Sequence, residues 1–485
     1  MSAANLGKKT LTGILWSSLE KMGGMALQFG VNIVMTRLLL PEAFGTVGML
    51  EIFIAVSQTL VEGGFASALI QKKDPSSTDY SSVFFCNLAI SLLLYAILFF
   101  SAPFIAAFYR MPMLCGLLRV LALIIVTSAL SIVQVNILKK KLSFRHIAFV
   151  NILSYALSAA AAITAAVSGL GAWAIVILML GNSAVSTIIF WISARWRPSP
   201  VCSIKAIKDL FSFGGYFLGA NILQEIAKNL QSIIIGRRFS ATDMGLFTQA
   251  YKLDRISSYT LPSIIVQVLF PVYSSIQDDD DRFAETLRSS VRLVAFIIFP
   301  LMAALIMCAS PLIRFLYTDT WLPAVPYFRI LCVGGFFVCL QNVNFYAVAA
   351  QGKSRALFLW SFYKWSFLIV ALVIAMFFGM KMILWAMTLS GFNIYLVNAA
   401  LAGRFSRYSL ISQIKDISLI ALNTLAPLTL AWWLSSLLSI STILSLPLFL
   451  ALYLLLAFVF HSKPLSDCIS IINRFRAKNA TTGKS

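Results

Sequence analysis

The residues of this chain best suited to chemistry are polar side chains that lie inside long apolar stretches. One group has the spacing i, i+3, i+4, i+7 and i+10, which places its members on one face of a helix: Asn221, Gln224, Glu225, Lys228 and Gln231. Glu51, Gln58 and Glu62 share a second face, and Gln28 and Asn32 form a third. Ionisable groups are costly in lipid, so such faces line a hydrated cavity or pair with one another.

The charges inside these stretches comprise slightly more cations than anions. The cations are Lys21, Lys228, Lys252, Arg255, Arg329 and Lys364. The anions are Glu20, Glu51, Glu62, Glu225 and Asp254. Lysine and arginine both bind phosphate, so this set is interpreted as a substrate-binding cavity for an anionic head group such as a pyrophosphate. The carboxylates are expected to pair these cations or to carry a coupling proton or sodium ion.

Structural roles for single members of this set remain open. Glu225 and Lys228 are three residues apart and can neutralise each other on one helix face. Lys252 and Arg255 can extend to the membrane surface if their helix starts later than predicted.

Other kinds of chemistry find little support in the sequence. The seven cysteines are scattered without a CxxC pair, and only two histidines occur, so disulfides, metal sites and histidine catalysis are not expected. The four aspartates of residues 278–281 are interpreted as a solvated acidic loop. No Walker motif is found, so ATP is not expected to drive the chain. We therefore predict no catalytic residue, no metal and no cofactor.

The elements that carry these charges are predicted to be membrane helices. The chain has 485 residues, of which 60% are hydrophobic and 12% charged, whereas a soluble domain has about 25% charged residues. Its apolar runs do not alternate as barrel strands do, and no cleavable signal peptide is expected. The fold class is an all-α polytopic membrane protein with about 14 spans. They begin near Leu11, Thr46, Tyr80, Gly116, Ser143, Gly171, Phe211, Met244, Ala284, Ala324, Arg355, Met382, Ile417 and Ser441.

The net charge of +20 fits this topology better than it fits nucleic-acid binding. Alternate short loops are rich in lysine and arginine, as in residues 139–145, 195–208 and 404–415. By the positive-inside rule these loops are cytoplasmic, and both basic termini lie on the same side. After Pro464 the tail is predicted either as an amphipathic surface helix or as a disordered basic segment.

Two short segments repeat at an offset of 200 residues. Arg37–Gly45 and Arg237–Gly245 both read Arg-x7-Gly at a predicted outer loop. The echo predicts parallel repeats, with six-helix lobes at residues 1–205 and 206–410 and two extra helices with a basic tail at 411–485.

The beginning of the chain resembles a known family. Gly13–Ser18, Val34–Gly45 and Gly63–Gln71 are similar to the start of bacterial polysaccharide flippases, members of the multidrug/oligosaccharidyl-lipid/polysaccharide exporter superfamily. The stretch from Arg37 to Gly45 is the most specific part. Gly245–Tyr251 resembles the second-lobe signature of the same family.

This resemblance implies two lobes in a V and alternating access in the cell inner membrane. The implied substrate is undecaprenyl-pyrophosphate-linked oligosaccharide, moved for synthesis of O-antigen (lipopolysaccharide), capsule or exopolysaccharide. The role of a cationic cavity is carried to Lys21, Lys228, Lys252 and Arg255 as a set.

Three other functions are kept as alternatives. A multidrug extrusion antiporter of the same superfamily would need an acidic or neutral cavity, which the buried cations disfavour. A membrane-embedded sugar polymerase or ligase would need a large outer loop, and none is found. A scaffold or lipid scramblase would differ from a coupled carrier in vesicle flux.

Overall fold

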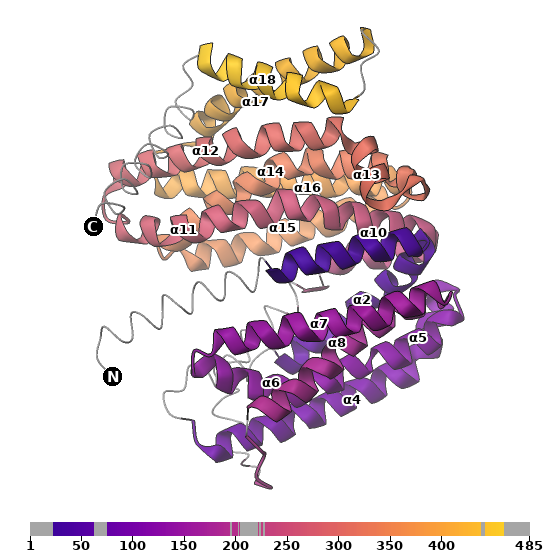
Figure 1. Cartoon of the computed structure of the whole chain (residues 1–485). Coiled ribbons are helices and arrows are strands. Elements are labelled where there is room, and N and C mark those ends of the chain that lie inside the picture. Colours follow the sequence, from indigo (N-terminus) through magenta and orange to yellow (C-terminus); the bar gives the residue numbers. More distant parts are fainter. Residues whose placement is uncertain are drawn as a thin grey trace, which may run out of the picture. The chain divides into compact units, whose positions relative to one another are not determined.

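The protein is helical throughout the part of the chain that the structure describes. The computed structural model describes residues 23–62, 75–194, 196–201, 203, 222, 225–226, 228–437 and 442–459, and no residue in these ranges belongs to a strand (Figure 1). Within these ranges, ten helices are long and apolar enough to cross a membrane. The prediction of an all-α polytopic membrane protein is therefore confirmed.

The ten spans correspond to the second to sixth and the ninth to thirteenth predicted spans. The predicted eighth and fourteenth spans lie on shorter or interrupted helices, described below. The first and seventh begin at Leu11 and Phe211, outside the described residues. The count of 14 therefore stays a prediction, as does the form of the tail after Pro464, which also lies outside them.

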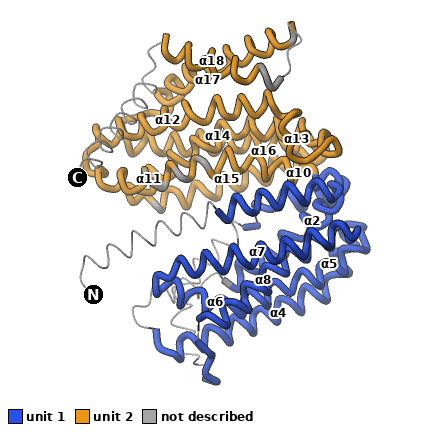
Figure 2. The backbone as a smooth tube through the Cα atoms, in the orientation of Figure 1, with its two compact units in different colours: residues 1–245 blue, residues 246–485 orange. Residues whose placement is uncertain are grey.

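Two compact units divide the chain, residues 1–245 and residues 246–485 (Figure 2). In the first unit, residues 23–38 and 228–238 are helical. Its other helices are α2 (Pro41–Glu62), α4 (Ser77–Tyr109), α5 (Met113–Leu121), α6 (Leu123–Lys140), α7 (Phe144–Val167) and α8 (Ala172–Ser193). The predicted lobe boundary between residues 205 and 206 falls outside the described residues.

Helix α6 lies at the centre of the first unit, packed against α4 and α8, while α7 packs along α8. Val83 and Phe84 of α4 form a core cluster with Val133 and Ile137 of α6. A capping box starts α4, because the hydroxyl of Ser76 accepts from the N–H of the residue three positions on. The cap fixes where the longest helix of this unit begins.

The two segments of the 200-residue echo have the same local structure. Each ends a helix, breaks for two residues and starts α2 at Pro41 or α10 (Ala241–Arg255) at Ala241. Within the first unit the segments also touch reciprocally. A Cβ on Gly45 would lie 1.7 Å from the backbone oxygen of Ala241, and a Cβ on Gly245 would lie 1.8 Å from that of Pro41. Only glycine permits this approach of two backbones.

The second unit is built around α14 (Val325–Ala350). This helix packs against α11 (Leu261–Ser275), α12 (Asp280–Met307) and α16 (Met380–Phe405). The remaining elements are η1 (Ile256–Thr260), α13 (Ala309–Tyr317), η2 (Asp319–Ala324), α15 (Ser354–Ala375), α17 (Leu410–Leu437) and α18 (Thr442–Val459).

The last two helices, α17 and α18, pack on each other and on α12. Ala303 and Met307 of α12 form a cluster with Ala431 of α17 and Phe449 of α18. The hydroxyl of Tyr453 donates to the backbone oxygen of Phe296 at 2.8 Å. The predicted extra pair is thus attached to the second unit chiefly through α12.

Candidate functional site

The polar residues predicted for the eighth span lie on a helix that is continuous but irregular. Helix α10 leads into a π turn, η1, and then into α11. Pro262, in the first turn of α11, has no N–H to donate to the carbonyl four residues earlier, which accounts for the widened turn. The hydroxyl of Thr260 donates to the backbone oxygen of Arg255 at 3.3 Å. Single π turns of this kind occur frequently at functional sites.

One face of this helix carries cations beside aromatic rings. The guanidinium carbon of Arg255 lies 4.7 Å from the ring centroid of Tyr259 and 5.7 Å from that of Tyr251. Phe247 stacks on Tyr251 with centroids 5.4 Å apart, and Lys252 is exposed beside them. An arginine held between aromatic rings keeps its N–H groups in a fixed orientation, which suits a phosphate oxygen.

The other face of the same helix is buried. Asp254 is 6% exposed, and its Oδ2 accepts a hydrogen bond from the hydroxyl of Ser258 at 3.0 Å. Opposite them on α14 is Gly335, where a Cβ would lie 3.1 Å from Ser258 Cβ and 2.7 Å from the sulfur of Met302. The glycine lets α14 pack closely against the acidic face of α10 and η1.

Two other predicted cations of the second unit lie on different helices. Lys364 of α15 is buried, and its Nζ donates to Asn398 Oδ1 at 3.0 Å and lies 5.7 Å from the ring centroid of Phe345. Arg329 is exposed near the start of α14, and its Nε donates to the backbone oxygen of Ile306 at the end of α12. In this conformation Lys364 has a partner inside the packing of α14, α15 and α16.

In the first unit, Glu225 and Lys228 form an ion pair at 3.8 Å. Asn229 donates to Glu225 Oε1 at 3.0 Å, so the carboxylate has a second partner. The Lys228 side chain is nevertheless 43% exposed. Glu51 is half-buried on α2. Glu20, Lys21 and the side chain of Glu62 lie outside the described residues.

The structure thus brings together Lys252, Asp254 and Arg255 on one helix of the second unit. Glu225 and Lys228 form a separate polar pair in the first unit. Arg329 and Lys364 occupy two further places in the second unit.

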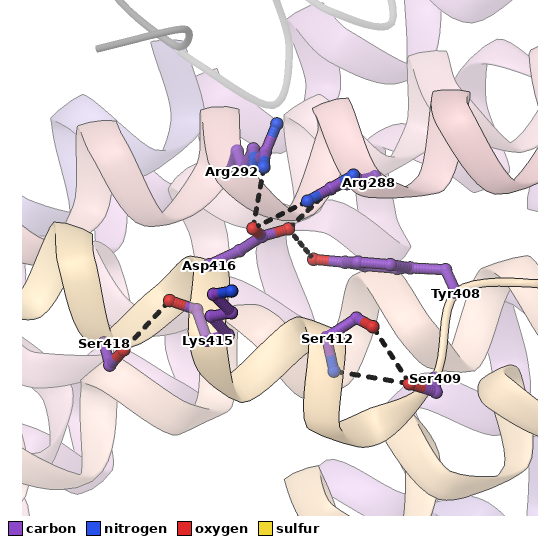
Figure 3. Close-up of polar contacts among 8 residues, drawn as sticks. All are labelled: Arg288, Arg292, Tyr408, Ser409, Ser412, Lys415, Asp416 and Ser418. Atoms are coloured by element: carbon purple, nitrogen blue, oxygen red, sulfur yellow. Dashed lines mark hydrogen bonds and ion pairs between the residues drawn. The ribbon is translucent and has the colours of Figure 1, made fainter.

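A polar cluster that the sequence analysis did not predict joins α12 to α17 (Figure 3). Asp416 accepts from Arg288 Nε at 2.8 Å and Nη2 at 3.1 Å, from Arg292 Nη2 at 2.7 Å and from the hydroxyl of Tyr408 at 2.8 Å. Burial and the carboxylate both raise the pKa of Tyr408, so its hydroxyl stays a donor. The four-residue spacing of the arginines was the available signal, since it places both on one helix face.

A protein-family model described as "Polysaccharide biosynthesis protein" matches residues 34–326. The chain belongs to this family. The resemblance seen between Arg37 and Gly45 is confirmed by this match.

Curated relatives are similar over most of their length. The chain is 25% identical to the teichuronic acid biosynthesis protein TuaB of Bacillus subtilis (strain 168), over 73% of this chain and 74% of TuaB. It is 26% identical to the succinoglycan biosynthesis transport protein ExoT of Rhizobium meliloti (strain 1021), over 73% and 72%. It is 23% identical to the lipopolysaccharide biosynthesis protein WzxC of Escherichia coli (strain K12), over 76% of each.

Solved structures give the fold. The lipid II flippase MurJ in an inward closed conformation matches with a TM-score of 0.74 at 17% identity, covering 92% of this chain and 99% of MurJ. An inward-facing multidrug resistance transporter of the MATE family matches with a TM-score of 0.59 at 15% identity, covering 84% and 98%. The chain therefore has the fold of these two transporters.

Proposed function

We propose that this protein is a flippase that moves a lipid-linked oligosaccharide from the cytoplasmic to the outer leaflet of the cell inner membrane. The substrate is an undecaprenyl-pyrophosphate-linked oligosaccharide destined for a surface polysaccharide. The observation that carries the proposal is the family match over residues 34–326, together with relatives named for the synthesis or transport of three different polysaccharides.

The aromatic and cationic face of α10 and η1 fits such a substrate. The guanidinium of Arg255, between the rings of Tyr251 and Tyr259, can hold a pyrophosphate oxygen through charge-assisted hydrogen bonds. Lys252 adds a mobile charge beside it. The exposed Lys228 of the first unit provides a further cation. The proposal keeps Lys21, Lys228, Lys252 and Arg255 as the candidate substrate-binding cations.

The proposal assigns no chemical reaction to the chain. Alternating access moves an intact substrate, so the protein acts as a carrier rather than an enzyme and uses no cofactor. Both termini face the cytoplasm, and the lobes comprise residues 1–205 and 206–410 with an appended segment 411–485. The carboxylates Glu20, Glu51, Glu62 and Glu225 balance the cavity cations.

A vesicle assay tests the function. The purified full-length chain is reconstituted in liposomes with a fluorescent undecaprenyl-pyrophosphate-linked oligosaccharide, and its exposure to an external lectin is followed with time. Losing one charge-assisted contact of about 1.5–3 kcal/mol lowers flipping about tenfold or more, so Arg255→Gln should be slow and Arg255→Lys intermediate.

Arg314→Gln is the matched control. Arg314 is a 65% exposed arginine that pairs with Asp319 at the end of α13, and its loss should leave flipping unchanged. Absence of any flipping by the wild-type protein, under conditions where it is folded, would overturn the proposed function. An equal loss of flipping in Arg255→Gln and Arg314→Gln would remove Arg255 from the binding face.

A further inference from the structure

A carboxyl group is buried in the second unit, and among the described residues no cation pairs with it. Asp254 is 6% exposed, and only its Oδ2 is satisfied, by Ser258. Its Oδ1 is buried and has no hydrogen-bond partner among the described residues. An ionised carboxylate in this position loses its hydration without replacement, which is strongly unfavourable in an apolar interior.

Two cations, Lys252 and Arg255, flank Asp254 on its own helix. Arg255, the next residue, is attracted to the carboxylate through space, yet its guanidinium stacks on Tyr251 and Tyr259. Within the described residues the two side chains form no ion pair. Lys252 is exposed on the same outer face. Adjacent residues of this helix thus have different roles: Arg255 lies on the proposed phosphate-binding face and Asp254 on the buried acidic face.

In the described part of the neighbouring helices, no cation pairs with Asp254. On α14, Gly335 lies beside Asp254, since a Cβ there would be 3.4 Å from Asp254 Oδ1, and the thiol of Cys332 is within electrostatic reach. On α12 the Met302 sulfur lies against Gly335, and this helix has no ionisable residue after Arg292. In the described part of the chain, Asp254 thus has one hydrogen-bond partner, Ser258, and lies close to Gly335 and Cys332.

This donor set suits a proton better than a sodium ion. Hard cations are bound by several oxygen ligands, whereas Asp254 Oδ1 has no hydrogen-bond partner among the described residues and Oδ2 accepts from the Ser258 hydroxyl. A proton needs only one oxygen, and Oδ1 offers it. A protonated Asp254 is neutral, and its dry surroundings then carry no penalty for charge burial.

We propose that Asp254 is the site at which this protein takes up and releases a coupling proton. The inference rests on the proposed flippase function. In the conformation described here Asp254 is protonated, with the proton on Oδ1 and the pocket closed by Gly335. Release breaks the O–H bond and passes the proton to water, leaving a carboxylate that cannot stay in the dry pocket.

The π turn gives this change a mechanical consequence. An ionised Asp254 draws in water, which loosens η1 from α14 at Gly335. Arg255 is the adjacent residue, so the same movement shifts the guanidinium that binds the pyrophosphate. An ionised Asp254 also attracts Arg255, competing with the substrate. Proton release and pyrophosphate release thereby favour each other.

A chemical probe tests protonation without any transport. A hydrophobic carbodiimide reacts with protonated carboxyl groups in apolar surroundings. The purified full-length chain should be modified at Asp254 at neutral pH, by peptide mass spectrometry, with labelling lost at alkaline pH. Asp281, 78% exposed, is the internal control and should stay unmodified. Gly335→Ala, which forces the pocket apart, should reduce labelling of Asp254.

Flux measurements link the site to transport. An inward or outward proton gradient should change wild-type flipping of the fluorescent lipid-linked oligosaccharide, whereas Asp254→Asn should flip without responding to the gradient. Labelling with no flipping would contradict the flippase function and leave the protonation site standing.

Two outcomes would overturn the inference. The first is absence of labelling at every pH in a folded protein. The second is protection of Asp254 from the carbodiimide by sodium chloride but not by choline chloride, which identifies sodium as the occupant.

Discussion

Replacing Asp416 by alanine should loosen α17 from α12. The change removes one carboxylate and leaves the guanidiniums of Arg288 and Arg292 and the hydroxyl of Tyr408 without their acceptor. Asp416 and Arg292 are 7% and 18% exposed, so breaking this pair belongs to the buried class, about 3–5 kcal/mol. Arg288 is 46% exposed, so its guanidinium can turn to water. Its contribution to the free energy of unfolding is therefore below about 1 kcal/mol. A net loss of about 3 kcal/mol is expected.

Thermal denaturation of the purified full-length protein measures the effect. A fluorescent fusion is heated in detergent, and the fraction that remains monodisperse is read by size-exclusion chromatography. Asp281→Ala is the matched control. Asp281 of α12 pairs with Arg407, which lies just before α17, but both partners are more than half exposed. That pair should contribute little or nothing.

The reasoning would be refuted by equal melting temperatures for Asp416→Ala and Asp281→Ala. Asp416→Asn adds a second check, because it keeps an acceptor oxygen and the volume while removing the charge. It should lie between the wild type and Asp416→Ala. A melting temperature for Asp416→Asn below that of alanine would show that the charges are not the stabilising element.

Three further predictions concern other parts of the chain. Gly45→Ala should destabilise the protein by about 1–3 kcal/mol in the same melting assay, because its Cβ would overlap a backbone oxygen of α10, whereas Gly24→Ala meets nothing within 4 Å and should be neutral. Lys228→Gln should abolish polysaccharide export in cells while the protein still inserts; normal export would remove this lysine from the site. Reporter fusions at Ser485 and within residues 139–141 should behave as cytoplasmic, and an external signal at either would exclude the proposed topology.

The sequence predicted the membrane helices well because lipid imposes a simple rule. Each apolar stretch must be long enough to cross and must satisfy its own backbone, so ten of the predicted spans could be recognised without tertiary information. The eighth span was harder, since Pro262 and the π turn interrupt it. Such irregularities depend on the packing of neighbouring helices as well as on the local sequence.

The environment of individual charges could be predicted much less well. Lys364 and Arg255 were both predicted as substrate-binding cations inside the membrane, yet Lys364 is buried against Asn398 and Arg255 stacks on tyrosines. Helix periodicity shows which residues share a face but not which neighbour that face meets. The Asp416 cluster was missed for the same reason, because its two arginines lie more than 120 residues from Asp416 in the sequence.

The reciprocal contact of Gly45 and Gly245 has a consequence for how this chain can change by mutation. Each glycine faces a backbone oxygen, so no neighbouring side chain can shrink to accommodate a substitution. Any side chain at one position displaces the helix that carries the other. The two positions should therefore show strong epistasis: a second substitution would cost less than the first, because the backbones have already separated. A single substitution at either glycine is therefore expected to be selected against.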